Sequence, residues 1–337
     1  MAATRLKEVA AFARVSVKTV SNVINDYPHV SADVRRRVQD AIKELNYRPN
    51  LAARALRSGR TGLVALLARD LDTTCLPGLT GHVIRAASAH GLRVAVNPFG
   101  PGTRATIPPG YADVSLRVDA ALVDADLISH ARLATNLTAG TPVVVLGETS
   151  HAHYDHVHPD AAQAARDAVN HLVHTGRRHI AAIGARSDTD RRAPHPYTLG
   201  YEQAVHRAGL RPAIGFLQTT TDTRHEDGYR AARNLFAQEQ RPDGIFCYDD
   251  RIAIGAIRAA IDIGLRVPQD VAVVGVGDTE EGRYSRPTLT SVCVDVAFVA
   301  REALDLIATR LGFGAGPPVR LVAPHAVLPR ESTGPTG

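Results

Sequence analysis

The stretch that decides the fold is residues 4–25, TRLKEVAAFARVSVKTVSNVIN, which predicts two short helices joined by a tight turn. In the first helix, expected over residues 6–13, apolar side chains recur with i, i+3, i+4 and i+7 spacing. The turn occupies residues 14–16, and the hydroxyl of Ser16 can accept a hydrogen bond from a first-turn amide of the second helix, residues 17–25. Two helices joined by so short a turn are typical of a helix-turn-helix.

The second helix is expected to have one packing face and one exposed face. Val20, Val23 and Ile24 share the side that packs on the first helix. The opposite side carries Val17, Lys18, Ser21, Asn22 and Asn25. In a helix-turn-helix such a face enters the major groove of DNA, so the pattern favours a DNA-binding module. The alternative is a three-helix satellite domain whose polar faces are simply solvated.

Two more helical segments complete the N-terminal module. A third helix begins after Ser31, whose hydroxyl is expected to cap it. Residues 49–59, PNLAARALRSG, predict a hinge helix, with proline in its first turn and glycine at its end. About ten residues are too few for a helix to persist alone in water, so this one would fold on meeting its partner. Two copies would lie in a minor groove with Leu56 wedged into a base step, whereas the alternative is a flexible linker.

The basic charge of the chain is concentrated in this module. Residues 1–60 contain 12 Lys and Arg against 5 Asp and Glu, a net charge of +7, whereas the whole chain carries +5. Residues 61–337 are therefore slightly acidic, at −2. All three lysines, Lys7, Lys18 and Lys43, lie in the module. Neutralising DNA phosphates requires local positive charge of this kind.

Residues 61–337 are long enough to form two layered lobes. Apolar runs predict buried parallel strands at residues 63–68, 92–96, 120–123, 143–146, 180–183, 245–247 and 271–274. Alanine-rich amphipathic stretches predict helices at residues 77–90, 161–174, 197–208, 250–263 and 295–311. Because strands and helices alternate, the predicted fold is an all-α helix-turn-helix followed by a core of doubly wound α/β sheets.

Several longer segments carry a family resemblance. In the module they are LKEVAAFARVSVKTVSNVIN at 6–25, HVSADVRRRV at 29–38 and ELNYRPNLAARAL at 44–56. In the core they are DAALVDAD at 119–126, GRRHIAAIG at 176–184, RPDGIFCYDDRIAIGA at 241–256, GLRVPQDVAVVGVGDTEEGRYSRPTLTSV at 264–292, APH at 323–325 and RES at 330–332. The chain resembles the LacI/GalR family of transcription repressors over nearly its whole length. The resemblance implies a homodimer that reads an inverted-repeat operator and is switched by a small-molecule effector.

The resemblance also implies a division of the chain into domains. It gives a DNA-binding domain at 1–48, a hinge helix at 49–60, and an effector-binding and dimerisation core at 61–337 that is similar to periplasmic binding proteins. Such a core has two lobes with a cleft between them, and the chain crosses three times, here near residues 160, 291 and 322. The expected first lobe is 61–160 with 291–322, and the expected second lobe is 161–290 with 323–333.

By resemblance, base reading falls to Val17, Lys18 and Asn22, because valine suits a thymine methyl, lysine a guanine and asparagine an adenine. Phosphate contacts are expected from Thr19, Ser21, Asn25, His29 and Ser31. The resemblance adds DNA contacts at Tyr47, Asn50, Ala53 and Leu56. Arg14 replaces a glycine that is frequent in the family's turn; it would add a phosphate contact, but a positive φ there would cost about 1 kcal/mol or more.

Ligands of open α/β sheets bind beyond the carboxyl ends of the strands. That rule and the resemblance together select Asp70, Cys75, Leu76, Glu148, Tyr197, Asp249, Asp250, Gly277 and Asp278 as candidate effector-binding residues. Asp249 holds the family position of a ligand-facing polar residue. Asp250 begins the following helix, so a role as its cap is the favoured interpretation.

This candidate site departs from the family pattern. Tyr197 stands where many members carry an arginine that grips the effector, and Gly277 replaces an aspartate that commonly bonds sugar hydroxyls. Val276 replaces an aromatic residue, Cys75 and Leu76 replace an aromatic pair, and the chain has no tryptophan. A polyol site needs convergent polar groups and a flat apolar wall. The effector is therefore a sugar or related metabolite, or an atypical ligand, or the site has weakened.

Other chemistry in the chain is discounted. His151, His153, Asp155, His156 and His158 have metal-ligating side chains but precede an expected crossing between lobes, so they are interpreted as a polar loop. No metal or cofactor is expected. The segment Gly275-Val276-Gly277 lacks the third glycine of a dinucleotide loop. A phosphate loop, G-x-S-x-G and H-E-x-x-H are absent from the sequence, so an enzyme is not indicated.

Location and assembly follow from the remaining features. The three cysteines are scattered, which fits reduced thiols in a cytoplasm. The sequence shows no signal peptide and no long apolar span. The alternatives are an exported solute-binding protein of the same two-lobe fold, which would lack the basic module, and a nucleotide-dependent α/β enzyme, which would need a phosphate loop.

The chain ends in RESTGPTG without apolar heptads, so a dimer rather than a coiled-coil tetramer is expected.

Overall fold

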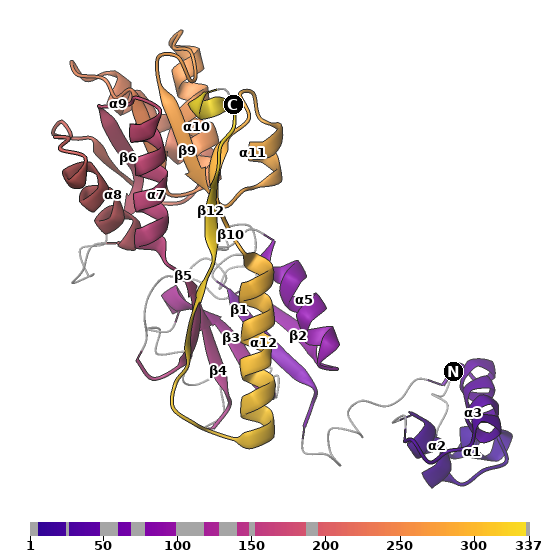
Figure 1. The fold of residues 1–337 in the computed structure, drawn as a ribbon. Helices are drawn as coiled ribbons and strands as arrows, with labels where there is room; N and C mark the ends of the chain where they lie inside the picture. The colour runs from indigo at the N-terminus through magenta and orange to yellow at the C-terminus, as the bar shows by residue number, and fades with distance from the viewer. Residues whose placement is uncertain are drawn as a thin grey trace, which may run out of the picture. The chain divides into compact units, whose positions relative to one another are not determined.

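The computed structural model describes residues 6–24, 27–47, 60–68, 78–98, 118–127, 140–147, 152–186 and 195–334 (Figure 1). The chain divides into two compact units, Met1–Thr61 and Gly62–Gly337. The predicted hinge helix lies outside the described residues. Within the described ranges, no helix combines the length and the apolar character that spanning a membrane would require.

The first unit contains the three predicted helices, α1 (Leu6–Phe12), α2 (Val17–Ile24) and α3 (Ala32–Glu44). The side chains with no exposed surface in the core of this unit are Val9, Val20, Val38 and Ala41. The predicted cap of α2 is confirmed, because the amide of Thr19 donates to Ser16 Oγ at 3.0 Å. The predicted cap of α3 is wrong in its chemistry: Ser31 occupies the N-cap position, but its hydroxyl makes no capping hydrogen bond. Instead, Asp33 places a negative charge in the first turn, where the helix dipole favours it.

The first sheet of the core has six parallel strands, in the order β11-β5-β4-β3-β1-β2. Helices α5 (Leu79–Ala89) and α12 (Val296–Phe313) pack together on one face and bury an aliphatic cluster there (Figure 1). A short 3-10 turn, Ala125–Leu127, follows β3. The strands are β1 (Leu63–Ala68), β2 (Arg93–Pro98), β3 (Ala120–Asp124), β4 (Val143–Leu146), β5 (Asp155–Pro159) and β11 (Arg320–Ala323).

The second sheet repeats this order as β12-β10-β9-β8-β6-β7, with β12 antiparallel to β10. Its strands are β6 (Ile180–Arg186), β7 (Leu217–Thr220), β8 (Gly244–Cys247), β9 (Ala272–Val276), β10 (Thr290–Val294) and β12 (His325–Leu328). Its helices are α7 (Ala161–His174), α8 (Pro196–Arg207), α9 (His225–Phe236), α10 (Asp250–Asp262) and α11 (Glu280–Tyr284), followed by the 3-10 turn Glu331–Thr333.

Both faces of the second sheet are covered, which explains its continuous apolar strands. Along β8, Ile245 and Cys247 face the cluster under α9 and α10, whereas Phe246 faces the cluster under α7 and α8. Tyr248, just beyond β8, continues the alternation on the α7 and α8 side. A doubly wound α/β core is therefore confirmed.

The chain passes three times between the two sheets, after β5, after β10 and after β11. The second passage lies later than the expected position near 291, because Thr290–Val294 pairs with β9 and β12 inside the second sheet. The chain therefore returns to the first lobe, which is defined here by its sheet, only at α12. The third passage lies between Ala323 and His325.

One predicted loop is a strand. Residues Asp155–Pro159 form β5, which pairs with β4 and β11, so the interpretation of the histidine-rich stretch as a polar loop is wrong at these positions. Several of their polar groups have partners within the protein: Asp155 forms a two-point ion pair with Arg310, with both distances 2.7 Å. The buried His156 bonds the carbonyl of Gly147 at 2.8 Å and stacks on His158. No metal-binding group of three such ligands occurs among the residues described.

Helices α9 and α10 cross so closely that glycine is required at the contact. A Cβ added to Gly255 would overlap the carbonyl oxygen of His225, and one added to Gly228 would overlap that of Ile252. We expect Gly255→Ala to lower the free energy of unfolding of the second lobe by about 1–3 kcal/mol, the usual cost of overpacking. Urea unfolding followed by circular dichroism measures it.

Gly312→Ala is the matched control, because Gly312 is also helical and an added Cβ meets no atom within 4 Å. This substitution should be neutral or stabilise by about 0.5 kcal/mol. Equal effects of the two substitutions would contradict the close-contact explanation.

Candidate DNA interface and effector site

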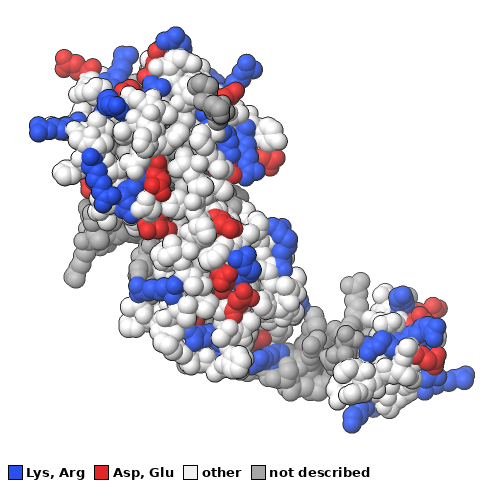
Figure 2. Space-filling view, viewed as in Figure 1, with Lys and Arg blue, Asp and Glu red and all other residues white. Residues whose placement is uncertain are grey.

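The three residues predicted to read bases lie on α2, on the side away from the core of the unit. Val17 keeps 40 % of its surface exposed and Lys18 is exposed, while Asn22 is half-buried. Val20 and Val23 point the other way, into the core of the unit. On the face shown in Figure 2, Lys and Arg side chains project from several parts of this unit. An apolar methyl surface, a cation and an amide therefore share one helix face, a combination that suits base edges in a major groove.

The expected phosphate contacts are placed around this helix. Thr19 and Ser21 are half-buried on α2, and the Thr19 hydroxyl lies 2.8 Å from that of Ser16. His29 and Ser31 are exposed before and at the start of α3, and the His29 ring lies edge-on to Tyr27. Tyr47 packs partly into the core of the unit. The remaining candidates lie outside the described residues: Asn25, Asn50, Ala53 and Leu56.

The candidate effector residues of the second lobe follow the carboxyl ends of its strands. Tyr197 is in the first turn of α8, Asp249 and Asp250 follow β8, and Gly277 and Asp278 follow β9. The structure brings them to one edge of the sheet, as the strand rule requires. The first-lobe candidates lie outside the described residues: Asp70, Cys75, Leu76 and Glu148.

Tyr197 is part of an aromatic cluster at this edge. Its buried ring lies 5.3 Å from Tyr248 and 6.0 Å from Phe246, centroid to centroid. The half-buried ring of His195, which caps α8, stacks on Tyr197 at 5.5 Å and on Tyr248 at 5.7 Å. The Tyr248 hydroxyl shares a 2.9 Å hydrogen bond with Thr198. The position at which many family members carry an effector-binding arginine is thus occupied by the packed ring of Tyr197.

The cap of α10 is Asp249 rather than Asp250, so the predicted role of Asp250 as the cap is wrong. Asp249 Oδ1 accepts from the amide of Arg251 at 2.8 Å, and its carboxylate pairs with the guanidinium of the same residue. The Arg251 guanidinium also donates to Thr223 Oγ1. Asp249 precedes the helix with extended backbone, the conformation of an N-cap residue, whereas Asp250 is already helical.

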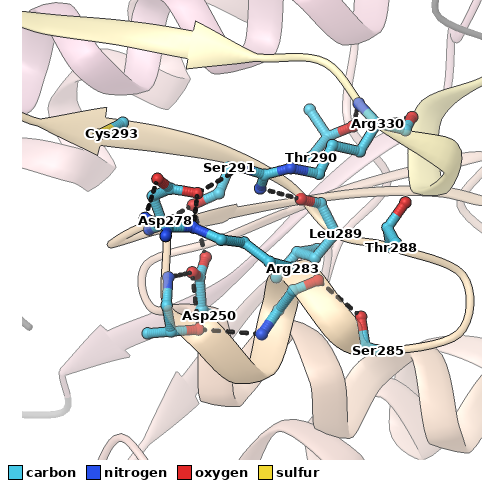
Figure 3. Close-up of polar contacts among 12 residues, drawn as sticks. Asp250, Asp278, Arg283, Ser285, Thr288, Leu289, Thr290, Ser291, Cys293 and Arg330 are labelled. Atoms are coloured by element: carbon cyan, nitrogen blue, oxygen red, sulfur yellow. Dashed lines mark hydrogen bonds and ion pairs between the residues drawn. The ribbon is translucent and has the colours of Figure 1, made fainter.

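Asp250 has no exposed surface and connects three segments (Figure 3). One carboxylate oxygen accepts from Ser291 Oγ of β10 at 2.6 Å. The other accepts from the amide and the hydroxyl of Thr279, at 2.7 and 3.1 Å. Burial raises the pKa of Asp250 to about 6, and the bonds from Ser291 and Thr279 limit the rise. Gly275 has no side chain because a Cβ there would overlap this carboxylate.

Asp278 is also engaged within the protein. Arg283 of α11 donates to one of its oxygens at 2.6 Å, and Arg330 donates to the other (Figure 3). Burial by itself would raise the pKa of this carboxyl, but the two guanidinium groups outweigh it and hold the pKa below its ordinary value. Arg330 also donates to the carbonyl of Leu289, which ties the segment after β12 to the start of β10.

Sequence patterns do not identify the partners that hold these carboxylates. Arg251, Arg283 and Arg330 each lie within a segment that carries the family resemblance, but no local pattern pairs them with a particular aspartate. Arg251 and Arg283 pair with aspartates two and five residues earlier in the chain. The pairing of Arg330 with Asp278, 52 positions apart, depends on the strand order, which brings β9, β10 and β12 together. The described carboxylates of the site thus all have internal partners.

Comparison with known proteins agrees with this architecture. The family described as bacterial regulatory proteins, lacI family, matches residues 5–50, and a periplasmic binding protein-like domain matches residues 169–333. The transcriptional repressor PurR of Erwinia tasmaniensis is 33% identical over 318 residues, covering 91% of this chain and 90% of PurR. The transcriptional regulator RegA of Clostridium saccharobutylicum is 28% identical over 341 residues, covering 98% and 99%.

Solved structures give the same result. The complex of transcriptional regulator CelR with cellobiose has a TM-score of 0.70 and 30% identity, covering 98% of this chain and 99% of CelR. The Lac repressor dimer bound to operator and the anti-inducer ONPF has a TM-score of 0.81 at 24% identity, covering 99% and 100%, and shows the shared fold.

The raised pKa of Asp250 makes its contribution to stability depend on pH. Because the folded pKa lies above the ordinary value of 3.8, the folded state holds the proton more tightly than the unfolded chain. Stability from this group is complete below pH 4 and is lost as the pH rises through about 6. Asp250→Asn removes this titration, so the stability of the wild type relative to the variant should fall by about 1–2 kcal/mol from pH 5 to pH 8.

Urea unfolding of both proteins across that range tests the expectation, with Asp270→Asn as a control at a half-buried carboxylate whose pKa Arg266 lowers to about 2. The control should show no such loss between pH 5 and pH 8. A stability difference between wild type and Asp250→Asn that is flat over this range would contradict the assignment.

Proposed function

This chain belongs to the LacI family of bacterial transcription regulators, and we propose that it is a repressor that binds an inverted-repeat operator as a homodimer and responds to a small-molecule effector. The family consists of DNA-binding regulators and not of enzymes. Since its target is DNA, we place its action in the cytoplasm.

The observation that carries the DNA-binding part is the exposed face of α2, held by a buried core on its opposite side. Val17, Lys18 and Asn22 offer an apolar contact, a cation and an amide within about one turn of the same helix. Positive charge is concentrated in the same short module, so phosphate attraction acts where the bases are read. We assign base reading to these three residues and phosphate contacts to their polar neighbours.

Dimerisation follows from the size of the reading surface. One helix-turn-helix reads only a few base pairs, so two copies on a two-fold axis are needed for a site of useful affinity and fixed spacing. The Lac repressor of the same fold is a dimer on its operator, which supports the same assembly here. In this arrangement, residues 49–60 of the two subunits would form hinge helices in the minor groove, with Leu56 as the wedge.

The effector would bind beyond the carboxyl ends of the core strands. CelR, which is similar to this chain, forms a complex with cellobiose. In the second lobe, Asp249 and Asp278 are already paired with arginines, and aromatic rings fill the region around Tyr197. Hydroxyl recognition would therefore fall chiefly on Asp70 and Glu148, with Cys75 and Leu76 nearby in sequence. A sugar or a related metabolite remains the first class to test. Effector binding would shift the lobes and change whether the hinge helices form.

We expect Asn22→Ala to relax base choice at one position in each half-site and to cost about 1–3 kcal/mol of operator affinity per half-site. Selection from a randomised duplex library, followed by affinity measurements on the selected site, checks both effects. Gln39→Ala is the matched control, because Gln39 is an exposed amide on α3, away from the proposed reading face. The same base preferences in Asn22→Ala and wild type would refute the assignment of Asn22.

We expect one class of ligand to raise the melting temperature of the core in a panel of sugars, sugar phosphates, nucleosides and amino acids. A ligand at about 100 times its Kd stabilises the state that it binds by roughly 2.7 kcal/mol. The same ligand should change operator affinity in a titration with labelled duplex. A protein that binds operator but responds to no member of the panel in either assay would contradict an effector of these classes.

A further inference from the structure

Among the described residues, six helices end in the same hydrogen-bonded motif. In each, the second residue after the end of the helix has positive φ. Its amide donates to the carbonyl of the residue three positions earlier, and the amide of the following residue donates to the carbonyl of the residue five positions before that one. This is the Schellman motif, in which glycine is favoured because the positive φ carries no Cβ penalty for it. The residues at the positive-φ position are Gly91 after α5, Gly176 after α7, Gly209 after α8, Gly264 after α10, Asn46 after α3 and Arg14 after α1.

Arg14 departs from the other five in residue type. Four positions carry glycine, and Asn46 is the side chain that best tolerates this conformation. Arg14 has φ of 53° with the same bonds, from its own amide to Ala11 at 3.2 Å and from the amide of Val15 to Ala10 at 3.0 Å. The motif is therefore fully formed, and only the side chain disfavours it. A costly backbone conformation of this kind tends to persist where the residue serves a function.

Among the described residues, the side chain of Arg14 finds no polar partner that would compensate for this cost. Arg14 is exposed, and none of its side-chain atoms forms a hydrogen bond or an ion pair with the residues that the structure describes. Its place in the fold is informative: Ser16, two residues later, caps α2, and the exposed Val17 and Lys18 begin the reading face. The guanidinium thus belongs to the turn that leads directly into the proposed recognition helix.

We propose that Arg14 is a phosphate-binding residue of the DNA interface, whose charge is kept at the expense of the stability of the turn. This inference rests on the proposed DNA-binding function and adds a contact to it. A planar guanidinium with five N–H donors matches the oxygens of a phosphate diester, and a phosphate needs no particular base sequence beside it. The contact therefore contributes equally to operator and to non-specific DNA.

Three substitutions in the full-length protein separate charge from backbone conformation. Arg14→Gln removes the charge and keeps the disfavoured φ, Arg14→Gly removes both, and Arg14→Lys keeps the charge. Affinity is measured for the selected operator duplex and for a scrambled duplex of equal length, over a series of salt concentrations. Thermal unfolding of the DNA-binding unit is followed by hydrogen exchange at its amides.

The Gln and Gly variants should lose affinity for both duplexes by about the same factor, roughly 5-fold to 30-fold at low salt for a dimer that loses two contacts. The slope of log K against log salt should become shallower by about 1.8, because each lost phosphate contact removes about 0.9. Arg14→Lys should retain most of the affinity and the slope. Arg14→Gly alone should raise the melting temperature of the unit, by about 4 °C or more.

Gly209→Arg is the matched control for the conformational argument. Gly209 occupies the same motif position after α8, and a Cβ there meets no atom within 4 Å. The substitution should lower the melting temperature of the core and leave DNA affinity and salt slope unchanged.

Wild-type affinity and slope in Arg14→Gln would overturn the inference, and so would a loss confined to the operator duplex, since that pattern identifies a base contact. A wild-type protein that binds neither duplex would overturn the proposed function itself, together with this contact.

Discussion

The carboxylate of Asp250 lies without solvent exposure at the start of α10 and accepts hydrogen bonds from Ser291 on β10 and from Thr279 before α11. The loops after β8 and β9 are thereby fixed to each other and to β10, the strand from which the chain leaves for the first lobe. A charge in this place is expensive unless its lone pairs are occupied, and the three donors provide that. Gly275 keeps the space beside it open. The arrangement of the second lobe around the proposed effector site depends on this one buried group.

At the same edge of the sheet, internal pairing engages several residues of the proposed effector site. Asp249 and Asp278 stand where polar ligand contacts were expected, but arginines from α10, α11 and the segment after β12 hold their carboxylates. Tyr197 packs against Phe246 and Tyr248 instead of presenting a charged group. A polyol needs acceptors that are not already satisfied, so this half of the site offers it little. In the proposed effector site, the second lobe would therefore contribute little hydrogen-bonding capacity from these carboxylates.

The DNA-binding unit follows a different principle, because its features are local. Its core is small, and each side chain of α2 is assigned to the buried or exposed face by helical periodicity alone. Ser16 caps α2 from the adjacent turn, and Arg14 accepts a positive φ three residues before Val17. Charge, cap and reading face therefore lie within a few residues of one another. Such a unit can change its base preference through single substitutions without disturbing the core.

The sequence by itself determined the helix-turn-helix, the apolar strands β1, β2, β3, β4, β6, β8 and β9, and the helices α5, α7, α8, α10 and α12, because periodicity and short-range capping encode these features directly. It did not identify β5, whose polar sequence DHVHP becomes a strand only when Arg310 and Gly147 satisfy Asp155 and His156. Nor did it identify which aspartate caps α10, or that Arg283 and Arg330 converge on Asp278. The pairings of Arg310 with Asp155 and of Arg330 with Asp278 join residues that are 155 and 52 positions apart, so they were decided by tertiary structure, which brings those residues together only when the strand order of the sheets is complete.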